Sequence, residues 1–143
     1  MSNPYADTAD AYWNAGWRGV LPLPHRRKKL PPTGYTGSTG TDPAYPDVAT
    51  WMQDGDRNIC LRLPAHVIGI DVDAYGDKAG AFTLREREAE WGQLPPTWRS
   101  TSRDDGISGI RLYRIPVGLA WPGGVGPGIE TVRRDHRYVV CAP

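Results

Sequence analysis

The most informative segment of the chain is Val67-Ile68-Gly69-Ile70-Asp71-Val72-Asp73. Its β-branched residues predict a strand over 67–73, and alternation along that strand places Asp71 and Asp73 on one face. The two side chains then lie about 7 Å apart, close enough to bind one cation. Adjacent anions at the end of a buried strand repel each other unless a cation or a proton neutralises them, and Mg2+ or Mn2+ prefers oxygen ligands. The alternative is that one carboxylate is exposed and the other caps a turn before 75–77.

A second segment with polar side chains is Ser108-Gly109-Ile110-Arg111-Leu112-Tyr113-Arg114. It predicts a small-residue turn that leads into a strand. Glycine would let backbone N–H groups approach a phosphate closely, and Arg111 would bind the phosphate oxygens. The alternative is an ordinary edge strand with solvated arginines.

A third segment is Pro127-Gly128-Ile129-Glu130-Thr131, followed by a basic turn over 133–137. Glu130, on a predicted strand, would supply a third carboxylate to the same cation. His136 would hold a phosphate or donate a hydrogen bond, although a lone histidine in a turn can equally be structural.

A run of basic residues opens a long loop over 24–42. Long ordered loops are often functional, and phosphate contacts from such a run would grip a nucleic-acid backbone. A solvated loop is the alternative. The four side chains concerned are Arg26, Arg27, Lys28 and Lys29.

Composition excludes several classes of protein. The 143 residues suit one domain over 1–143, and 17 basic against 16 acidic residues leave a net charge of +1. That balance excludes a histone-like polycation, but it does not exclude a local basic surface. No apolar run approaches the roughly 18 residues of a membrane helix, and the N-terminus lacks signal-peptide features. Cys60 and Cys141 form no C-x-x-C pair, which indicates free thiols and predicts a cytoplasmic protein.

Hydrophobic periodicity predicts a mixed helix and sheet fold. We expect helices from Ser2 or Asn3 to near Gly16, over 43–53 with Asp42 as N-cap, and over 77–91. We expect strands over 18–23, 58–63, 67–73, 98–103, 109–115, 128–133 and 137–141, the second and third forming a hairpin through 64–66. Consecutive strands favour antiparallel pairing, so the fold class is α/β of the α+β type with a largely antiparallel or mixed sheet. Because the chain stops at Pro143 directly after an apolar strand, we expect it to be the front of a longer polypeptide.

Taken in order, these segments resemble the bifunctional primase/polymerase domain of the archaeo-eukaryotic primase superfamily, found in phage and plasmid replication proteins. No single motif is specific, but the ordered set is, and it covers nearly the whole chain from Ala11. The matching segments are Ala11-Tyr12-Trp13-Asn14-Ala15-Gly16-Trp17, Val20-Leu21-Pro22-Leu23, Lys29-Leu30-Pro31, Asn58-Ile59, Ile70-Asp71-Val72-Asp73, Leu94-Pro95-Pro96-Thr97, residues 108–113, Gly128-Ile129-Glu130 and Tyr138-Val139-Val140-Cys141-Ala142-Pro143.

The resemblance implies two small mixed modules around a catalytic cleft and a nucleotidyltransferase with DNA primase and polymerase activity. It implies that Asp71, Asp73 and Glu130 bind two divalent ions, Mg2+ or Mn2+. Ser108 and Arg111 would bind the incoming NTP or dNTP, with His136 as a helper. Two departures matter: Arg111 stands where relatives have histidine, and Glu130 replaces the commoner aspartate.

The resemblance also implies partners. Template and primer DNA would lie along the basic loop and Arg133 or Arg134. A C-terminal helicase region or a helicase partner is expected, with no membrane, a bacterial host cytoplasm and a monomeric state for this fragment. Two other functions remain open: a non-catalytic single-stranded DNA-binding or initiator module, and a D-x-D phosphatase or glycosyltransferase, although Ala74-Tyr75 fits the phosphatase pattern poorly.

Overall fold

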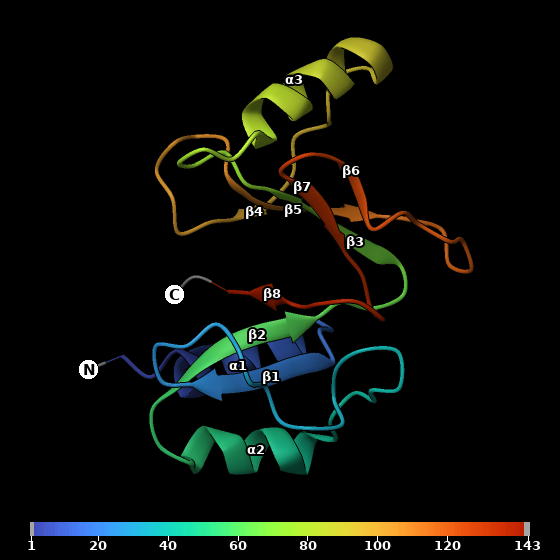
Figure 1. The fold of residues 1–143 in the computed structure, drawn as a ribbon. Coiled ribbons are helices and arrows are strands. Elements are labelled where there is room, and N and C mark those ends of the chain that lie inside the picture. Colours follow the sequence, from blue (N-terminus) through green and yellow to red (C-terminus); the bar gives the residue numbers. More distant parts are fainter. Residues whose placement is uncertain (1, 142–143) are drawn as a thin grey trace. The chain divides into compact units, whose positions relative to one another are not determined.

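The computed structural model describes residues 2–141, which fold into two compact units. Unit 1 contains residues 2–64 and 133–141, and unit 2 contains residues 65–132. Unit 1 consists of α1 (Pro4–Asn14), β1 (Gly19–Pro24), α2 (Tyr45–Gln53), β2 (Arg57–Arg62) and β8 (Val139–Val140) (Figure 1). Unit 2 consists of β3 (Val67–Val72), α3 (Gly80–Trp91), β4 (Arg99–Ser100), β5 (Gly109–Arg114), β6 (Gly124–Gly126) and β7 (Ile129–Val132).

In unit 1 both helices pack against one face of an antiparallel sheet with the order β1-β2-β8. Val20 pairs with Leu61 in the register, so both side chains point towards the helices. The core on this face consists of Tyr5, Ala9, Val20, Val48, Ile59, Leu61 and Cys141. Helix α1 begins at Asn3, whose side chain accepts a hydrogen bond from the N–H of Ala6 at 3.3 Å.

The long loop between β1 and α2 covers the other face of this sheet. Its Tyr35 packs against Leu21, Leu23 and Cys60. Arg62, only 3% exposed, lies on the same face and binds this loop, because its Nη2 donates to the carbonyl of Gly37 at 3.0 Å. The loop is therefore attached to the sheet both by the apolar contacts of Tyr35 and by the hydrogen bond of Arg62.

Arg62 is the centre of a buried polar cluster. Its Nε donates to the carbonyl of Arg134 at 3.0 Å, and its Nη1 lies 3.5 Å from Asp42. Asp42 also binds the guanidinium of Arg134 at 3.1 Å. Burial, and secondarily the charge of Arg134, lowers the pKa of Arg62, whereas Asp42 opposes that shift. One carboxylate thus lies between two guanidinium groups and joins the loop to the segment before β8.

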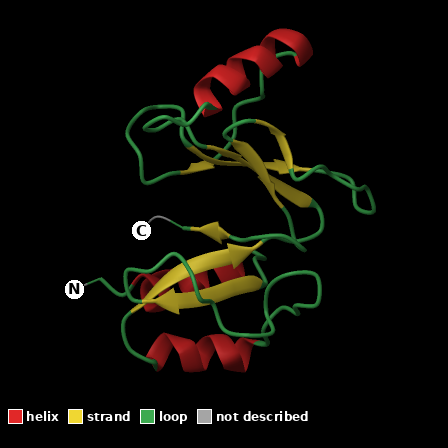
Figure 2. Cartoon of the chain, viewed as in Figure 1, coloured by secondary structure: helices red, strands yellow, loops and turns green. Residues whose placement is uncertain are grey.

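The five strands of unit 2 pair antiparallel in the order β4-β5-β3-β7-β6, accompanied by α3 (Figure 2). Register and alternation divide their side chains between two faces. The carboxylate face carries Gly69, Asp71, Ile110, Leu112, Glu130 and Val132. The helix face carries Ile68, Ile70, Val72, Arg111, Tyr113, Ile129 and Thr131, and Glu88 of α3 interacts with Arg111 and Tyr113 there.

The α+β class with antiparallel sheets is confirmed, and the predicted hairpin over 58–73 is wrong. Both edges of β2 are occupied, by β1 and by β8, so β3 has no edge to pair with there and joins the sheet of unit 2 instead. Strand β6 was not predicted, because Gly124-Val125-Gly126 lacks the composition of a strand. Of the predicted motif over 138–143, residues 142 and 143 lie outside the described residues.

Two predicted helix starts are also corrected. Helix α2 begins at Tyr45 after Ala44, and the carboxylate of Asp47 accepts the N–H of Ala44 at 3.1 Å. Asp42 lies two residues before this N-cap, and its carboxylate binds Arg62 and Arg134 instead. Helix α3 begins at Gly80, three residues later than expected. Within residues 2–141 no helix has the length and apolar character needed to cross a membrane.

Arg62→Lys is expected to lower the free energy of unfolding by about 1.5–3 kcal/mol, the contribution of a hydrogen bond to a charged group. Lysine keeps the charge but lacks the planar fork that reaches the carbonyls of Gly37 and Arg134 together. Urea unfolding followed by tryptophan fluorescence measures the change. Arg57→Lys is the control, since its pair with Asp54 is largely exposed and should change stability by no more than about 0.5 kcal/mol. Equal losses in both variants would contradict this role for Arg62.

Candidate active site

Asp71 and Glu130 lie directly opposite each other on β3 and β7. Directly opposed side chains in an antiparallel pair share a face, with Cβ atoms about 5 Å apart. Glu130 is exposed and Asp71 is partly buried. Two carboxylates at this spacing present oxygen donors of the kind that hard divalent cations prefer. The register therefore brings together two of the three carboxylates that the sequence predicted to act jointly.

Asp73 follows β3 directly, at a point where three segments meet. Its N–H donates to the carbonyl of Gly128 at 2.8 Å, and its carbonyl accepts the N–H of Gly80 at 2.9 Å. A Cβ on Gly80 would collide with the carbonyl of Asp73, and a Cβ on Gly128 would collide with the nitrogen of Gly80. The two glycines therefore allow the end of β3, the start of α3 and the start of β7 to approach closely. Continued alternation places Asp73 on the same face as Asp71.

Ser108 links the end of β3 to the turn before β5. Its hydroxyl accepts the N–H of Ala74 at 2.9 Å and donates to Oδ2 of Asp105 at 2.5 Å, and the side chain is 2% exposed. Oδ1 of Asp105 accepts the N–H groups of Ile107 and Ser108 at 2.8 and 2.7 Å. The Ser108 hydroxyl, together with these two N–H groups, holds the pKa of Asp105 at about 2.

This contact gives Ser108 a positioning role, while its predicted contact with a nucleotide stays a prediction. Sequence analysis missed Asp105. The signal in the sequence was the pair Asp105-Gly106, which lies three and two residues before Ser108. This pair is typical of an Asx turn, in which the carboxylate accepts nearby N–H groups.

Arg111 lies on the opposite face of the sheet from Asp71. It pairs with Ile70, whereas Asp71 pairs with Ile110, so alternation directs Arg111 to the helix face. Its interaction with Glu88 of α3 agrees with this placement. The register of the sheet therefore does not bring Arg111 together with the carboxylates. Binding of one nucleotide by Arg111 and these carboxylates together stays a prediction.

The other predicted residues belong to unit 1. Arg133 and His136 exchange two backbone hydrogen bonds, at 2.9 and 3.0 Å, which close a tight turn with His136 exposed. Nε of Arg133 lies 3.8 Å from Asp135, and Arg134 binds Asp42. Contacts of His136 with a nucleotide, and of the two arginines with DNA, stay predictions.

The basic loop carries four exposed side chains: Arg26, Arg27, Lys28 and Lys29. Its backbone is attached to the sheet of unit 1 at two carbonyls. Asn58 donates to the carbonyl of Arg27 at 2.8 Å, and the hydroxyl of Tyr138 donates to the carbonyl of Lys28 at 3.0 Å. Because both contacts use the backbone, they hold the loop without using the charged groups.

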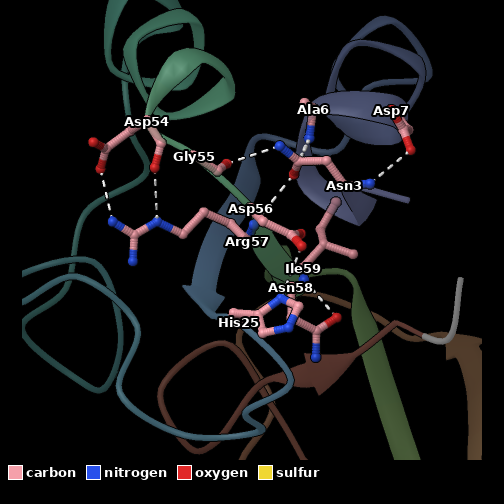
Figure 3. Close-up of polar contacts among 10 residues, drawn as sticks. All are labelled: Asn3, Ala6, Asp7, His25, Asp54, Gly55, Asp56, Arg57, Asn58 and Ile59. Atoms are coloured by element: carbon pink, nitrogen blue, oxygen red, sulfur yellow. Dashed lines mark hydrogen bonds and ion pairs between the residues drawn. The ribbon is translucent and has the colours of Figure 1, made fainter. Parts of the chain in front are cut away.

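The start of this loop is held by a second set of contacts around Asn3 (Figure 3). The side chain of Asn3 donates to the carbonyl of Gly55 at 2.8 Å and accepts the N–H of Arg57 at 3.2 Å. These bonds fix the turn that contains Asp56, whose Oδ2 lies 2.9 Å from Nδ1 of His25. The residue before the four basic side chains is thus tied to the N-terminus of α1.

Among residues 2–141, no three His, Cys, Asp or Glu side chains come close enough together to hold a metal ion by themselves. Mg2+ is commonly held by one or two carboxylates together with substrate phosphates and water. The opposed oxygen donors of Asp71 and Glu130 fit Mg2+ or Mn2+ on that basis and do not suit soft metals. Asp73 as a further ligand stays a prediction.

Comparison with known proteins identifies the family. Asp71 and Glu130 lie on neighbouring strands near Gly80 and Gly128, and carboxylates in such a place are suited to divalent-ion chemistry on phosphates. A family model described as bifunctional DNA primase/polymerase, N-terminal, matches residues 9–143. The chain therefore belongs to the Prim-Pol family, as the order of its motifs predicted. No curated protein and no solved structure matched the chain.

Asp105→Asn is expected to destabilise the protein at pH 7, with an effect that diminishes as the pH falls towards 2. The pKa of Asp105 lies below its ordinary value of 3.8, so its charged form stabilises the fold above about pH 4, and this contribution is lost as the pH falls towards 2. Thermal unfolding midpoints measured from pH 2 to pH 7 test this. Asp104→Asn, at an exposed neighbouring position, is the control; a loss of stability that is independent of pH would contradict the assignment.

Proposed function

We propose that this chain is the catalytic core of a template-dependent DNA primase and polymerase, a nucleotidyltransferase that uses two divalent metal ions. Family membership over residues 9–143 supports the proposal. The single observation that carries it is the opposed pair Asp71 and Glu130. Oxygen donors in register on two neighbouring strands suit a divalent cation, which a module that only binds single-stranded DNA does not require.

Asp71, Asp73 and Glu130 are the proposed metal-holding residues. When bound there, Mg2+ or Mn2+ would lower the barrier to attack by a primer 3′-hydroxyl on the α-phosphate of an NTP or dNTP and would neutralise the pyrophosphate leaving group. Asp105 acts indirectly. Its carboxylate accepts a hydrogen bond from the Ser108 hydroxyl, and that hydroxyl accepts the N–H of Ala74. This chain of bonds fixes the backbone next to Asp73. His136 and Ser108 are proposed to contact the incoming nucleotide, as the family resemblance implies.

The proposed DNA-binding residues are Arg26, Arg27, Lys28, Lys29, Arg133 and Arg134. The tethered backbone of the basic loop supports this assignment, because an already ordered loop loses less conformational entropy on binding a template or primer. The resemblance to phage and plasmid replication proteins supports a role in DNA replication in a bacterial host cytoplasm, beside a helicase region or partner.

Asp71→Asn and Glu130→Gln are each expected to reduce incorporation of labelled dNTP on a primed template by at least about 100-fold, the scale on which lost electrostatic stabilisation slows an enzyme. The midpoint of thermal unfolding in EDTA should be unchanged or higher, because each change removes one of two opposed charges. Mn2+ should raise the midpoint of the wild type but not of either variant. Asp104→Asn, an exposed acidic position in the same unit, is the charge-matched control.

Full incorporation by both variants would contradict the metal-binding assignment. A wild-type protein that binds single-stranded DNA yet incorporates no nucleotide, with either Mg2+ or Mn2+, would favour the binding module instead. Release of phosphate from a simple phosphoester would favour the phosphatase.

Neutralising the basic loop is expected to weaken template binding and flatten its salt dependence. Each contact with a single-stranded phosphate contributes about 0.7 to the slope of log K against log salt, so two lost contacts lower the slope by about 1.4. Fluorescence anisotropy of the R26Q/R27Q, K28Q/K29Q and fourfold variants measures it. The control is K78Q/R85Q, which removes as much charge as either double variant at exposed positions outside the loop. A slope as steep in the fourfold variant as in the wild type would show that the loop is only solvated.

A further inference from the structure

The imidazole of His25 faces the carboxylate of Asp56 at the start of the basic loop (Figure 3). Nδ1 of His25 lies 2.9 Å from Oδ2 of Asp56, and the His25 side chain is 53% exposed. The second carboxylate oxygen of Asp56, Oδ1, is buried and has no hydrogen-bond partner within residues 2–141. The oxygen of this carboxylate that has a partner is thus the one that faces the imidazole.

The turn that carries His25 has a strained backbone. The N–H of Arg27 donates to the carbonyl of Pro24 at 2.9 Å, which closes a tight turn. Arg26, at the third position of this turn, has a φ of +55°, a left-handed conformation that favours glycine or asparagine and is unfavourable for an arginine. Such strain persists only where neighbouring contacts hold the segment, and it is common at binding sites. The pair of His25 with Asp56 is one contact that holds it.

Asp56 is itself held on both sides along the chain. The side chain of Asn3 donates to the carbonyl of Gly55 at 2.8 Å and accepts the N–H of Arg57 at 3.2 Å. These bonds join the residues before and after Asp56 to the N-cap of α1. The carboxylate of Asp56 therefore provides a fixed position against which the ring of His25 is oriented.

The ring of His25 has a second nitrogen, which points away from Asp56. Nε2 lies on the opposite side of the ring from Nδ1, and Nδ1 is the atom that faces the carboxylate. A carboxylate beside one ring nitrogen determines the tautomer and the orientation of the ring. A neutral imidazole donates from one nitrogen only, whereas an imidazolium donates from both. When the ring is protonated, Nε2–H is a charged donor next to the four basic side chains of the loop.

The other charged groups around His25 do not titrate near neutral pH. Arg26 and Arg27 follow in the same turn, and Arg57 lies on the neighbouring strand β2. Guanidinium groups keep their charge in proteins, and carboxylates of ordinary pKa are charged above about pH 6. The hydroxyl of Tyr138, which holds the next part of the loop, stays neutral because burial raises its pKa. A change in affinity between pH 6 and pH 8.5 that requires His25 therefore reports protonation of its ring.

We propose that His25, oriented by Asp56, donates from Nε2 to a backbone phosphate of the nucleic-acid strand that the basic loop binds, and that the ring makes this contact only when it is protonated. His25 is then a strand-binding residue, and Asp56 is a positioning residue. The proposal rests on the proposed role of the basic loop in template binding. It has a consequence that net charge does not predict. Removal of the negative charge of Asp56 weakens binding of a polyanion, whereas Coulomb's law alone predicts tighter binding.

The test measures fluorescence anisotropy of a single-stranded oligonucleotide in EDTA, at pH 6 and at pH 8.5. It compares the wild type with His25→Gln, Asp56→Asn, the double variant and two matched controls. Asp54→Asn makes the same chemical change two residues away, at an exposed carboxylate that binds Arg57. His66→Gln removes an exposed histidine of unit 2. Urea unfolding at pH 6 checks that each variant is folded.

At pH 6 we expect His25→Gln and Asp56→Asn each to bind about tenfold more weakly than the wild type, the effect of losing a charge-assisted contact of about 1.4 kcal/mol. The salt slope of His25→Gln should fall by about 0.7, the value for one single-stranded phosphate contact. The double variant should bind no more weakly than either single variant, because both changes remove the same contact. At pH 8.5 the loss in His25→Gln should disappear. Asp54→Asn should bind at least as tightly as the wild type, and His66→Gln should bind as the wild type does.

Three results would overturn the proposal: tighter binding by Asp56→Asn at pH 6, an equal loss in Asp54→Asn, or a loss in His25→Gln that is the same at both pH values. If Asp56→Asn does not fold, His25→Gln decides by itself, because its loss must be present at pH 6 and absent at pH 8.5. A wild type that binds no oligonucleotide overturns the role of the basic loop together with this proposal. A wild type that binds, with an affinity that neither change alters, overturns this proposal alone.

Discussion

The antiparallel pairing of β3 with β5 on one side and with β7 on the other determines which side chains of unit 2 act together. A slip of one residue in either pairing would move every side chain of that strand to the other face. Gly69 lies where this pairing is most crowded: a Cβ there would lie 2.8 Å from Cγ2 of Ile110 and 3.1 Å from Cβ of Val132. Glycine at this position lets both neighbouring strands pack closely against β3.

The same register separates charges of opposite sign. Asp71 and Glu130 lie on one face, and Arg99 and Arg111 lie on the other. The sheet thus prevents the arginine pair from serving as the counterion of the carboxylate pair. The register therefore groups the oxygen donors of two strands on one face and places the guanidinium groups on the other.

In unit 1 the main constraint is different: a long polar loop is held in one conformation. Apolar contacts of Tyr35 cover one part of it, and the buried guanidinium of Arg62 binds its carbonyl at Gly37. Backbone tethers from Asn58 and Tyr138 hold the basic segment. Since none of these tethers uses a basic side chain of the loop, an ordered loop and an exposed positive surface are compatible.

The sequence by itself determined most of the elements, the α+β class and the family, because periodicity, capping and the order of motifs can be seen along the chain. Only the tertiary structure decided that β2 and β3 belong to different sheets, that Asp71 meets Glu130, and that Arg111 turns away from both. These facts depend on the register between strands that are distant in the sequence, such as those that carry Asp71 and Glu130, 59 residues apart. No local preference specifies that register. Asp42 shows the same limit: its local sequence predicted a helix cap, but the helix begins at Tyr45, and the Asp42 carboxylate binds two arginines that are distant in the sequence.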